Sequence, residues 1–464
     1  MASKATARSL PTYRCAECGW QTTKWVGRCA ECHAWASVDD VGAPKIRTTV
    51  AGQVTAPARR IGEVDVAAAR AKPTEVPELD RVLGGGLVPG AVVLLAGEPG
   101  VGKSTLLLEV AARVAEGDAT VLYVTGEESA AQVRLRAERI GAVADRLYLA
   151  AETDLAAVLG HLDTVAPALL VLDSVQSIGS AQVDGSPGGV SQVREVAAVL
   201  TKVAKERDIA TVLVGHVTKD GSIAGPRVLE HLVDVVLHFE GDRSSRLRMV
   251  RGVKNRYGPA DEVGCFDLSD DGIKGLPDPS GLFLSRRDEP VAGTCVTVTI
   301  EGKRPLLAEV QALVAASHLA TPRRATNGLE SSRVAMVLAV LERRGRVRLS
   351  ESDVYASTVG GVRLNEPAAD LALALAVASA ARDRALPTDV VALGEVGLAG
   401  EIRHVTGVQR HLAEAARLGF RRALVPRDPG PCPEGMYIVE VNDMHGALAM
   451  LESGVRAGPG LPPR

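Results

Sequence analysis

The chain has 464 residues, of which 46% are hydrophobic and 23% charged, and a net charge of −3 at pH 7. This length predicts two or three domains with real hydrophobic cores. The charge balance excludes a globally basic protein, and an aromatic content of 3% argues against extensive base-stacking platforms. No apolar run approaches the ~18 residues that span a bilayer, and the first ten residues lack the apolar core of a signal peptide. We therefore expect a cytoplasmic protein without membrane contact.

Four of the seven cysteines lie within the first 32 residues, as two Cys-x2-Cys pairs separated by ten residues. Each pair can present two thiolates to one side, and two pairs complete a tetrahedral site for Zn2+. Because such a site has no open position, it is structural, and zinc supplies folding energy that so short a segment cannot obtain from a core. Disulfides and a redox Cys-x-x-Cys are the alternatives. The predicted zinc ligands are Cys15, Cys18, Cys29 and Cys32.

Two tryptophans accompany this cysteine module. Trp20 and Trp25 are predicted to pack around the cysteine pairs, with contact to a partner as the alternative. A zinc ribbon can bind nucleic acid or protein, and both possibilities stay open. Residues 41–70, which contain several glycines and prolines and no long periodic segment, are interpreted as a linker.

A glycine-rich loop follows a short apolar run at residues 91–96, which is typical of a buried parallel strand. The loop, Gly97 to Ser104, has the pattern G-x-x-x-x-G-K-S, and residues 105–115 place apolar side chains at helical spacing. Strand, glycine loop and helix together predict the phosphate-binding loop (P-loop) of a nucleoside triphosphatase. An ordinary glycine turn entering a helix is the alternative.

The chemistry of this loop assigns roles to its residues. Its glycines let backbone N–H groups close around phosphate, and the helix N-terminus adds a favourable dipole. We expect Lys103 to reach the β- and γ-phosphates of ATP and Ser104 to ligate Mg2+. Asp173, at the end of the apolar run 168–173, is expected to hold the Mg2+ shell opposite Ser104. The predicted nucleotide-binding residues are Gly97, Glu98, Pro99, Gly100, Val101, Gly102, Lys103, Ser104, Thr105 and Asp173.

Strands and helices alternate along this part of the chain. Helical periodicity is found at residues 130–140, 153–162 and 190–207, and apolar runs typical of strands lie at residues 120–125, 146–150, 168–173 and 209–214. Such repetition predicts a parallel sheet with helices on both faces. Ligands then bind at the carboxyl ends of the strands, where the P-loop is expected to meet Glu127, Asp173 and His216.

ATP hydrolysis needs a group that orients or deprotonates the attacking water. Glu127 and Glu128 follow the strand after the P-loop helix, and a carboxylate there can face the γ-phosphate. We favour Glu127, with Glu128 as assistant or substitute. The alternative is an acidic pair at a helix N-terminus, stabilised by the helix dipole. His216 is interpreted either as a phosphate sensor or as a hydrogen-bonded core histidine.

Residues 234–240, 246–253 and 262–267 are predicted to extend the sheet as an antiparallel set, with 254–258 as the loop between the last two. A charge run is usually a solvated face. The spacing here also places several cations on the outward side of a strand, where they could enter a neighbouring subunit's nucleotide site as an arginine finger does. The cations are Arg243, Arg246, Arg248, Arg251, Lys254 and Arg256.

Over nearly its whole length the chain resembles the bacterial RadA (Sms) family of DNA-repair and recombination ATPases. The resemblance is carried by the four-cysteine ribbon, the segment ELDRVLGGGLVPG at 78–90, the P-loop, the run LVLD at 170–173, and the pentapeptide KNRYG at 254–258, the family's own signature. It implies an ATPase core similar to RecA and to hexameric replicative helicases of the DnaB type. It also implies that Lys254 and Arg256 act in trans across a ring interface, and that hexameric rings on single-stranded DNA drive branch migration alongside RecA.

The chain from residue 281 onward resembles the Lon protease domain, through residues 364–371 and 394–403. Lon proteases place a nucleophilic Ser where this chain has Ala368, and a Lys where it has Gln409. Without a hydroxyl nucleophile and an amine base, Ser–Lys acyl chemistry is impossible. The resemblance therefore implies a scaffold domain for ring assembly. Candidates for a DNA-facing surface, with a solvated face as the alternative, are Arg333, Arg343, Arg344, Arg346 and Arg348.

The expected architecture is α/β, with a zinc ribbon at 1–40, a linker at 41–70, a RecA-like P-loop ATPase core at 71–275, and an α+β Lon-like domain at 281–464. The expected function is that of a DNA-dependent ATPase in recombinational DNA repair, with ATP, Mg2+ and Zn2+ as cofactors. Its expected partners are single-stranded and branched DNA, contacted by loops 177–192 and 217–226, and the recombinase RecA. The alternatives are a KaiC-like signalling ATPase without DNA, an ATP-dependent protease and a non-catalytic zinc scaffold.

Overall fold

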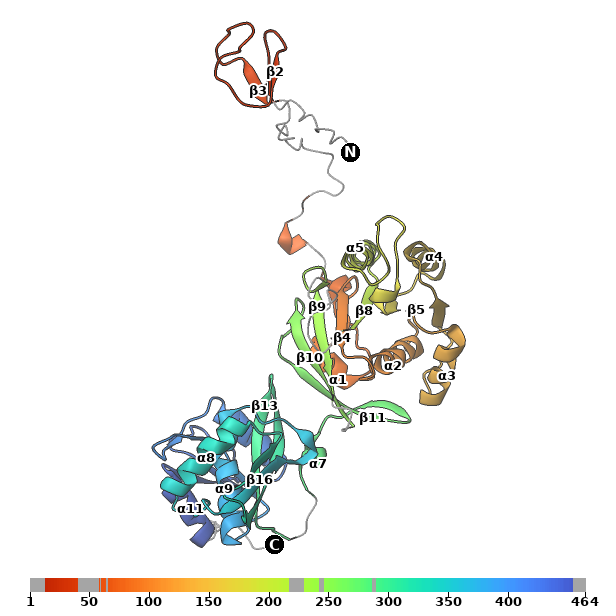
Figure 1. Ribbon diagram of the computed structural model, residues 1–464. Helices are drawn as coiled ribbons and strands as arrows, with labels where there is room; N and C mark the ends of the chain where they lie inside the picture. Colours follow the sequence, from red (N-terminus) through yellow and green to blue (C-terminus); the bar gives the residue numbers. More distant parts are fainter. Residues whose placement is uncertain are drawn as a thin grey trace, which may run out of the picture. The chain divides into compact units, whose positions relative to one another are not determined.

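The protein is described by a computed structural model that covers residues 13–40, 58, 60–63, 66–216, 229–241, 246–285 and 289–453 (Figure 1). The chain divides into two compact units, Met1–Asp65 and Val66–Arg464. The second unit contains a nine-stranded sheet and a seven-stranded sheet. The finer boundaries given above for the linker, the ATPase core and the Lon-like domain stay predictions.

The first unit contains a three-stranded antiparallel sheet of β1 (Tyr13–Cys15), β2 (Gln21–Thr22) and β3 (Val38–Asp40). Its small core consists of Cys15, Cys29 and Val38, and Trp20 packs against it as predicted. The prediction for Trp25 is wrong, because this side chain is 66% exposed. A core of three residues is too small to cover a second indole.

The nine-stranded sheet has the order β12-β11-β10-β9-β4-β8-β7-β5-β6. The six strands from β9 to β6 run parallel, and β10, β11 and β12 continue the sheet antiparallel. The predicted antiparallel set is confirmed, since β10 pairs antiparallel with both β9 and β11, and β9 joins this set to the parallel strands by pairing with β4. The strands are β4 (Val92–Gly97), β5 (Val121–Thr125), β6 (Leu147–Ala151), β7 (Leu169–Asp173), β8 (Ala210–His216), β9 (Val235–Glu240), β10 (Leu247–Asn255), β11 (Val263–Ser269) and β12 (Gly272–Gly275).

Helices cover both faces of this sheet, as Figure 1 shows. Side chains of one strand alternate between the two faces, so Val93 packs with α1 (Pro77–Leu83), α2 (Lys103–Glu116) and α3 (Ala130–Ile140) on one side. Leu94 packs with α4 (Leu155–Val165) and α5 (Val190–Arg207) on the other. Burial on both faces explains the uninterrupted apolar runs of the central strands. Short 3-10 turns lie at η1 (Ile61–Glu63), η2 (Ala67–Ala69) and η3 (Val175–Ser177).

The seven-stranded sheet has the order β15-β16-β14-β13-β17-β20-β21, and mixes parallel and antiparallel pairs. Helices α8, α9 and α11 share one apolar core with it, and α10 packs in a second core with β13 and β17. The strands are β13 (Thr294–Glu301), β14 (Arg304–Ala316), β15 (Arg324–Asn327), β16 (Ser352–Thr358), β17 (Val390–Ala392), β20 (Arg422–Pro426) and β21 (Tyr437–Val441), with a separate pair β18 (Glu395–Val396) and β19 (Ile402–Arg403). The helices are α7 (Ser280–Phe283), α8 (Ser331–Arg343), α9 (Asp370–Arg382), α10 (Val408–Arg417) and α11 (Met444–Ser453), with 3-10 turns η4 (Val359–Gly361) and η5 (Pro367–Ala369).

The tip of the β13–β14 hairpin joins the two sheets of the second unit. Arg304, 5% exposed, pairs with Glu78 of α1, 2% exposed. Lys303 N donates to Asp261 O at 2.8 Å, and the apolar core around the hairpin includes Val263 and Cys265 of β11. The buried ion pair, the backbone hydrogen bond and the apolar core together hold the hairpin tip against α1 and β11.

Within the described residues, no helix combines the length and the apolar character needed to cross a membrane.

Candidate functional site

The glycine-rich loop joins the end of β4 to the start of α2, as predicted. Gly97 lies so close to β9 that a Cβ atom there would be 2.4 Å from Phe239 O. Gly102 has φ +108° directly before the first residue of α2, a conformation that glycine adopts without strain. The loop therefore needs glycine at these two positions, and its amides precede a helix N-terminus.

Lys103 is 3% exposed and lies inside the loop. Its Nζ donates to Gly97 O at 2.8 Å and to Glu98 O at 2.9 Å. Burial lowers the pKa of Lys103 to about 8, although Asp173 and Glu127 act in the opposite direction. The ammonium is thus held by two backbone carbonyl oxygens of the loop, near the negative charges of Asp173 and Glu127.

Asp173 ends β7 beside the end of β5, where it pairs in register with Thr125. Its side chain is held by Tyr123, whose hydroxyl donates to Asp173 Oδ2 at 2.7 Å. Ser104 lies in the first turn of α2, immediately after Lys103. A carboxylate and a hydroxyl are oxygen donors of the kind that Mg2+ prefers, so this pair fits the ion that accompanies ATP. Sequence reasoning missed Tyr123, whose signal was a single polar group within an apolar strand.

Glu127 is in contact with polar groups from two strand ends. Ser174 Oγ donates to Glu127 Oε1, and His216 Nε2 lies 3.1 Å from the same oxygen. His216 is the last residue of β8 and pairs in register with Gly97, so this histidine belongs to the P-loop edge of the sheet and not to a core. Among the described residues, His216 Nδ1 is buried without a hydrogen-bond partner.

The alternative interpretation of the acidic pair as a helix N-terminus is not what the structure shows. The N-cap of α3 is Ser129, which forms a capping box with Gln132. Glu128 pairs with Arg136 of α3, whereas Glu127 faces Ser174 and His216. The two carboxylates therefore have different partners, which their adjacent positions in the sequence could not reveal.

The pentapeptide at 254–258 is not a free loop, which corrects the expectation above. Lys254 and Asn255 still belong to β10, after a register shift between Gly252 and Lys254. Lys254 Nζ donates to Glu230 O at 2.6 Å and to Val233 O at 2.8 Å. Asn255 Nδ2 donates to Leu83 O at 3.0 Å, at the C-terminus of α1.

Arg256 is anchored by a buried carboxylate that sequence reasoning missed. Its Nη1 lies 3.0 Å from Asp234 Oδ1, with side-chain exposures of 55% for Arg256 and 1% for Asp234. Asp234 also accepts from Lys205 Nζ at 2.9 Å and from Val92 N at 3.1 Å. Burial alone would raise the pKa of Asp234, but Lys205, the Val92 amide and Arg256 outweigh it and the pKa is lowered. Asp234 is therefore a charged hub between β4, α5 and the pentapeptide.

Lys254 and Arg256 lie far from the P-loop of their own chain. Lys254 pairs with Val236, and Val236 with Leu94, so Lys254 is level with a residue three positions before Gly97. Three residues of strand correspond to ~10 Å, and the two intervening strand spacings add ~10 Å sideways. Lys254 also contacts Glu230 O and Val233 O, and Arg256 N donates to Asp234 O, all of which precede β9. The two cations therefore lie toward the edge of the sheet opposite the strand ends that carry Asp173 and His216.

Three other cations of the same cluster have partners within the chain, which corrects the expectation of an outward-facing basic strand. Arg248 is buried and donates to Val101 O at 3.0 Å. Arg251 pairs with Glu301 at 2.7 Å, and Arg246 pairs with Asp267 at 2.7 Å. Arg243 lies outside the described residues.

The loop expected at 177–192 is organised by a buried glutamine. Gln192, 3% exposed, accepts from Ser180 N at 2.8 Å and donates to Ser180 O at 3.1 Å and Gly185 O at 3.2 Å. The segment contains no Lys or Arg, so DNA contacts made by it would use backbone groups or uncharged polar side chains. The second expected loop, 217–226, lies outside the described residues.

The four cysteines of the ribbon converge as predicted. Their sulfur atoms all lie within 4.8 Å of one another. Cys15 Sγ is 3.7 Å from Cys32 Sγ, and Cys18 Sγ is 3.6 Å from Cys29 Sγ. A tetrahedron with metal–sulfur bonds of about 2.3 Å has edges of about 3.8 Å, so the sulfur atoms fit a zinc ion and are too far apart for disulfides.

The C-terminal domain lacks the chemistry of a peptidase at the two positions compared. Ala368 is buried in η5, and Gln409 Nε2 donates to Pro429 O at 2.8 Å. The expectation for Arg333 as a DNA-facing residue is corrected, because this side chain binds both oxygens of Asp370. Arg343, Arg344, Arg346 and Arg348 are exposed.

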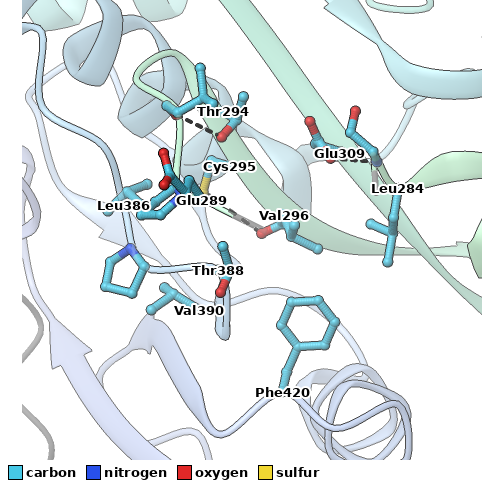
Figure 2. A pocket seen from close by; sticks show the side chains of 14 residues that line it. Leu284, Glu289, Thr294, Cys295, Val296, Glu309, Leu386, Thr388, Val390 and Phe420 are labelled. Atoms are coloured by element: carbon cyan, nitrogen blue, oxygen red, sulfur yellow. Dashed lines mark hydrogen bonds between the residues drawn. The ribbon is translucent and has the colours of Figure 1, made fainter. Parts of the chain in front are cut away.

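A pocket of about 220 Å³ lies elsewhere in this domain (Figure 2). It is lined by apolar side chains such as Leu386 and Phe420 and by the buried carboxylate of Glu309, which accepts from Ser285 N at 2.8 Å. Neither Ala368 nor Gln409 lines it, so it is not a remnant of the dyad site.

The fold and the site define a class of protein. A P-loop at the carboxyl edge of a parallel sheet, with Lys103 inside it and Asp173 beside it, is the architecture of a RecA-like P-loop ATPase. Family models agree, with matches to an AAA domain at 57–222, a rubredoxin metal binding domain at 13–40 and subunit ChlI of Mg-chelatase at 360–429. Zn2+ in the ribbon and ATP with Mg2+ in the ATPase domain are the cofactors.

The chain belongs to the RadA family of DNA repair proteins. It is 56% identical to DNA repair protein RadA of Mycobacterium tuberculosis strain H37Rv over 96% of this chain and 93% of that protein. The RadA proteins of Mycolicibacterium smegmatis and Pseudomonas aeruginosa are 56% and 47% identical, over 96% of this chain and 98% and 99% of their own length. A solved KaiC-like protein, PH0186 of Pyrococcus horikoshii, is 23% identical over 45% of this chain with a TM-score of 0.38. The chain is therefore a DNA-repair ATPase.

Proposed function

We propose that this ATPase binds single-stranded and branched DNA, assembles into a homo-hexameric ring and uses ATP hydrolysis to drive branch migration alongside RecA. The observation that carries the proposal is the position of Lys254 and Arg256. Both lie at the edge of the sheet opposite their own P-loop, so a nucleotide that they stabilise must be bound by another protomer. A head-to-tail arrangement that closes on itself is a ring.

In this proposal the residues at the P-loop edge of the sheet have separate roles in ATP binding and hydrolysis. Lys103 and the loop amides hold the β- and γ-phosphates, and Ser104 with Asp173 holds Mg2+, which neutralises the developing charge. Glu127 orients the attacking water, and His216 fixes its carboxylate. The geometry that supports this division is the contact of Glu127 with Ser174 and His216, next to the buried ammonium of Lys103.

A mixing experiment tests the proposed seam between protomers. Lys103→Ala removes the phosphate contact, and Lys254→Ala removes the cation offered to the neighbour, so each variant alone should lose DNA-stimulated hydrolysis. In an equimolar mixture, about a quarter of the seams combine the intact lysines of both variants. DNA-stimulated turnover should therefore reappear on mixing.

Two results would contradict the proposal. Turnover that stays at the sum of the two separate variants shows that Lys254 does not act across a seam. Turnover of the wild-type chain that does not respond to added DNA favours a KaiC-like ATPase that acts without DNA. Protease activity is disfavoured by Ala368 and Gln409, and only cleavage of casein by the purified protein would support that alternative.

A further inference from the structure

All three tryptophans of the chain lie between residues 20 and 35, within the zinc ribbon. Trp20 packs against the ribbon core, but Trp25 is 66% exposed and Trp35 is 74% exposed. Two exposed indole rings are unusual on so small a module. Large exposed apolar side chains that cluster mark interaction sites. The fold of the ribbon does not explain them, since its core is formed without either side chain.

The two exposed indoles flank the same short stretch of backbone. Arg28 and Trp35 form an antiparallel bridge, and Ala36 N donates to Gly27 O at 2.9 Å. The Trp25 ring lies against Gly27, where an added Cβ would be 3.7 Å from Cη2. Trp25 and Trp35 are therefore next to consecutive residues of one segment, Gly27 and Arg28. We name Lys24, Trp25, Arg28 and Trp35 together the tryptophan face.

Two cations accompany the indoles on this face. The Arg28 guanidinium lies 5.6 Å from the centre of the Trp35 ring and is oriented by a hydrogen bond from Nε to His33 O at 3.0 Å. Lys24 is exposed and directly precedes Trp25 in the sequence. The Trp35 indole thus has a guanidinium beside its ring, and Lys24 is a second exposed cation one position before Trp25. Stacking surfaces together with cations are what binding of unpaired nucleotides requires.

We propose that the tryptophan face binds single-stranded DNA by stacking bases on Trp25 and Trp35 while Lys24 and Arg28 contact phosphates. The proposal rests on the DNA binding proposed above and adds a second contact region to it. Residues 13–40 carry three Lys or Arg and four Asp or Glu, so a uniform positive field does not attract the strand. Stacking then supplies most of the affinity, and the ribbon's share should depend only weakly on salt. Tryptophan and arginine also dominate protein interfaces, which makes a protein partner the competing outcome.

The chain itself carries the probe for the test. Because the only tryptophans are in the ribbon, the intrinsic tryptophan fluorescence of the full-length, zinc-loaded protein reports on the ribbon alone. Titration with an oligo-dT strand should quench this emission. Trp25→Ala and Trp35→Ala should each weaken oligo-dT binding by about 5- to 150-fold, since a base stacked on an aromatic ring contributes about 1–3 kcal/mol.

Trp20→Phe is the matched control, because it keeps an aromatic ring in the ribbon core and leaves the tryptophan face intact. It should bind oligo-dT as tightly as the wild type. Zinc content measured for each variant shows that the ribbon is still folded. A loss of affinity in Trp25→Ala with full zinc content supports the proposal.

Three outcomes overturn the proposal, and each has a distinct meaning. If oligo-dT stimulates ATP hydrolysis but leaves the tryptophan emission unchanged, the tryptophan face does not bind DNA although the proposed function stands. If oligo-dT changes neither signal, the proposed function fails as well. If a purified recombinase quenches the emission and oligo-dT does not, the face is a protein-docking surface.

Discussion

At the scale of single residues, the site combines two buried groups, Lys103 and Asp173, with the more exposed carboxylates of Glu127 and Glu128. Lys103 donates to two carbonyls of its own loop, and Asp173 and Glu127 oppose the lowering of its pKa by burial. The neighbouring carboxylates have separate partners, Ser174 and His216 for Glu127 and Arg136 for Glu128. Because the contacts differ, changing each residue should affect ATP binding or hydrolysis differently.

The lowered pKa of Lys103, about 8, predicts that ATP binding takes up a proton in alkaline solution. Above this pH the free amine is mostly neutral, and a bound triphosphate restores the ammonium. By linkage, ATP affinity should fall by up to about tenfold per pH unit above pH 8. Calorimetry in buffers of different ionisation enthalpy measures the proton uptake. Lys103→Arg is the control, because its guanidinium does not titrate there; equal uptake by both proteins would contradict the assignment.

The separate partners of the two glutamates predict unequal effects of neutralising them. Glu127→Gln should keep ATP binding and lower the hydrolysis rate by about 10²- to 10⁴-fold, the contribution of a positioned acid–base group. Glu128→Gln only loses its pair with Arg136 and should reduce the rate much less. Single-turnover hydrolysis with a separate nucleotide-binding assay distinguishes the two. A larger loss in Glu128→Gln would exchange the proposed roles.

At the scale of elements, two distant segments form one structural unit. The Asn255 side chain donates to Leu83 O at the C-terminus of α1. Gly258 lies so close to the turn after α1 that an added Cβ would be 3.1 Å from Gly84 Cα. A register shift in β10 between Gly252 and Lys254 re-aims the strand in the way a β-bulge does. As a result, Lys254 and Arg256 are both held against the segment 230–234, which precedes β9.

Asp234 is predicted to be the positioning residue of this unit. Asp234→Asn keeps the shape but removes the charge that holds Arg256 and Lys205. ATP affinity should remain unchanged while DNA-stimulated turnover falls toward the level of Arg256→Ala. Combining both substitutions should cost little more than Arg256→Ala alone, because they remove the same contact.

A purely structural role for Asp234 would instead lower ATP affinity and DNA-stimulated turnover together, and the two substitutions would add. The lowered pKa of Asp234 also sets the sign of its pH dependence. Its contribution to stability is present above the unfolded pKa of about 3.9 and is lost as the pH falls through the lower folded value. The stabilising effect is therefore complete at neutral pH.

At the scale of the whole molecule, the second unit is held together by a hairpin tip that carries a buried ion pair. Arg304 contacts Glu78 and donates to Leu276 O at 3.2 Å, while Cys265 N donates to Glu78 Oε2 at 2.8 Å. Both charges are almost fully buried, and they come from α1 beside the nine-stranded sheet and from β14 of the seven-stranded sheet. Such a pair stabilises the fold little more than apolar side chains in its place would. Removing one partner, however, leaves an unpaired charge in the core.

Arg304→Met should therefore lower the free energy of unfolding by about 3–5 kcal/mol, because Glu78 stays buried without its partner. Adding Glu78→Gln should recover part of the loss, since the amide carries no charge. Arg81→Ala is the control, because Arg81 approaches the same Glu78 at 3.7 Å from a half-exposed position, and such pairs contribute about 0–1 kcal/mol. Urea denaturation measures all three; equal losses for Arg81→Ala and Arg304→Met would contradict the burial argument.

The sequence by itself determined those features that depend on neighbours along the chain. The P-loop, the cysteine pairs and the bounds of α3 and α5 follow from spacing and periodicity, because a helix or a turn is stabilised by residues within a few positions. The loss of the Ser–Lys dyad at Ala368 and Gln409 is likewise visible in the sequence, because these side chains supply neither a nucleophile nor an amine base in any fold.

Only the tertiary structure decided which distant groups meet. The direction of β9, the burial of Arg248, the exposure of Trp25 and the pairing of Asp234 with Arg256 all depend on segments that approach one another in space. Sequence patterns record whether a side chain is apolar or charged, but a charge is free or neutralised according to the partner that folding brings to it. That partner can be 226 residues away, as Glu78 is from Arg304.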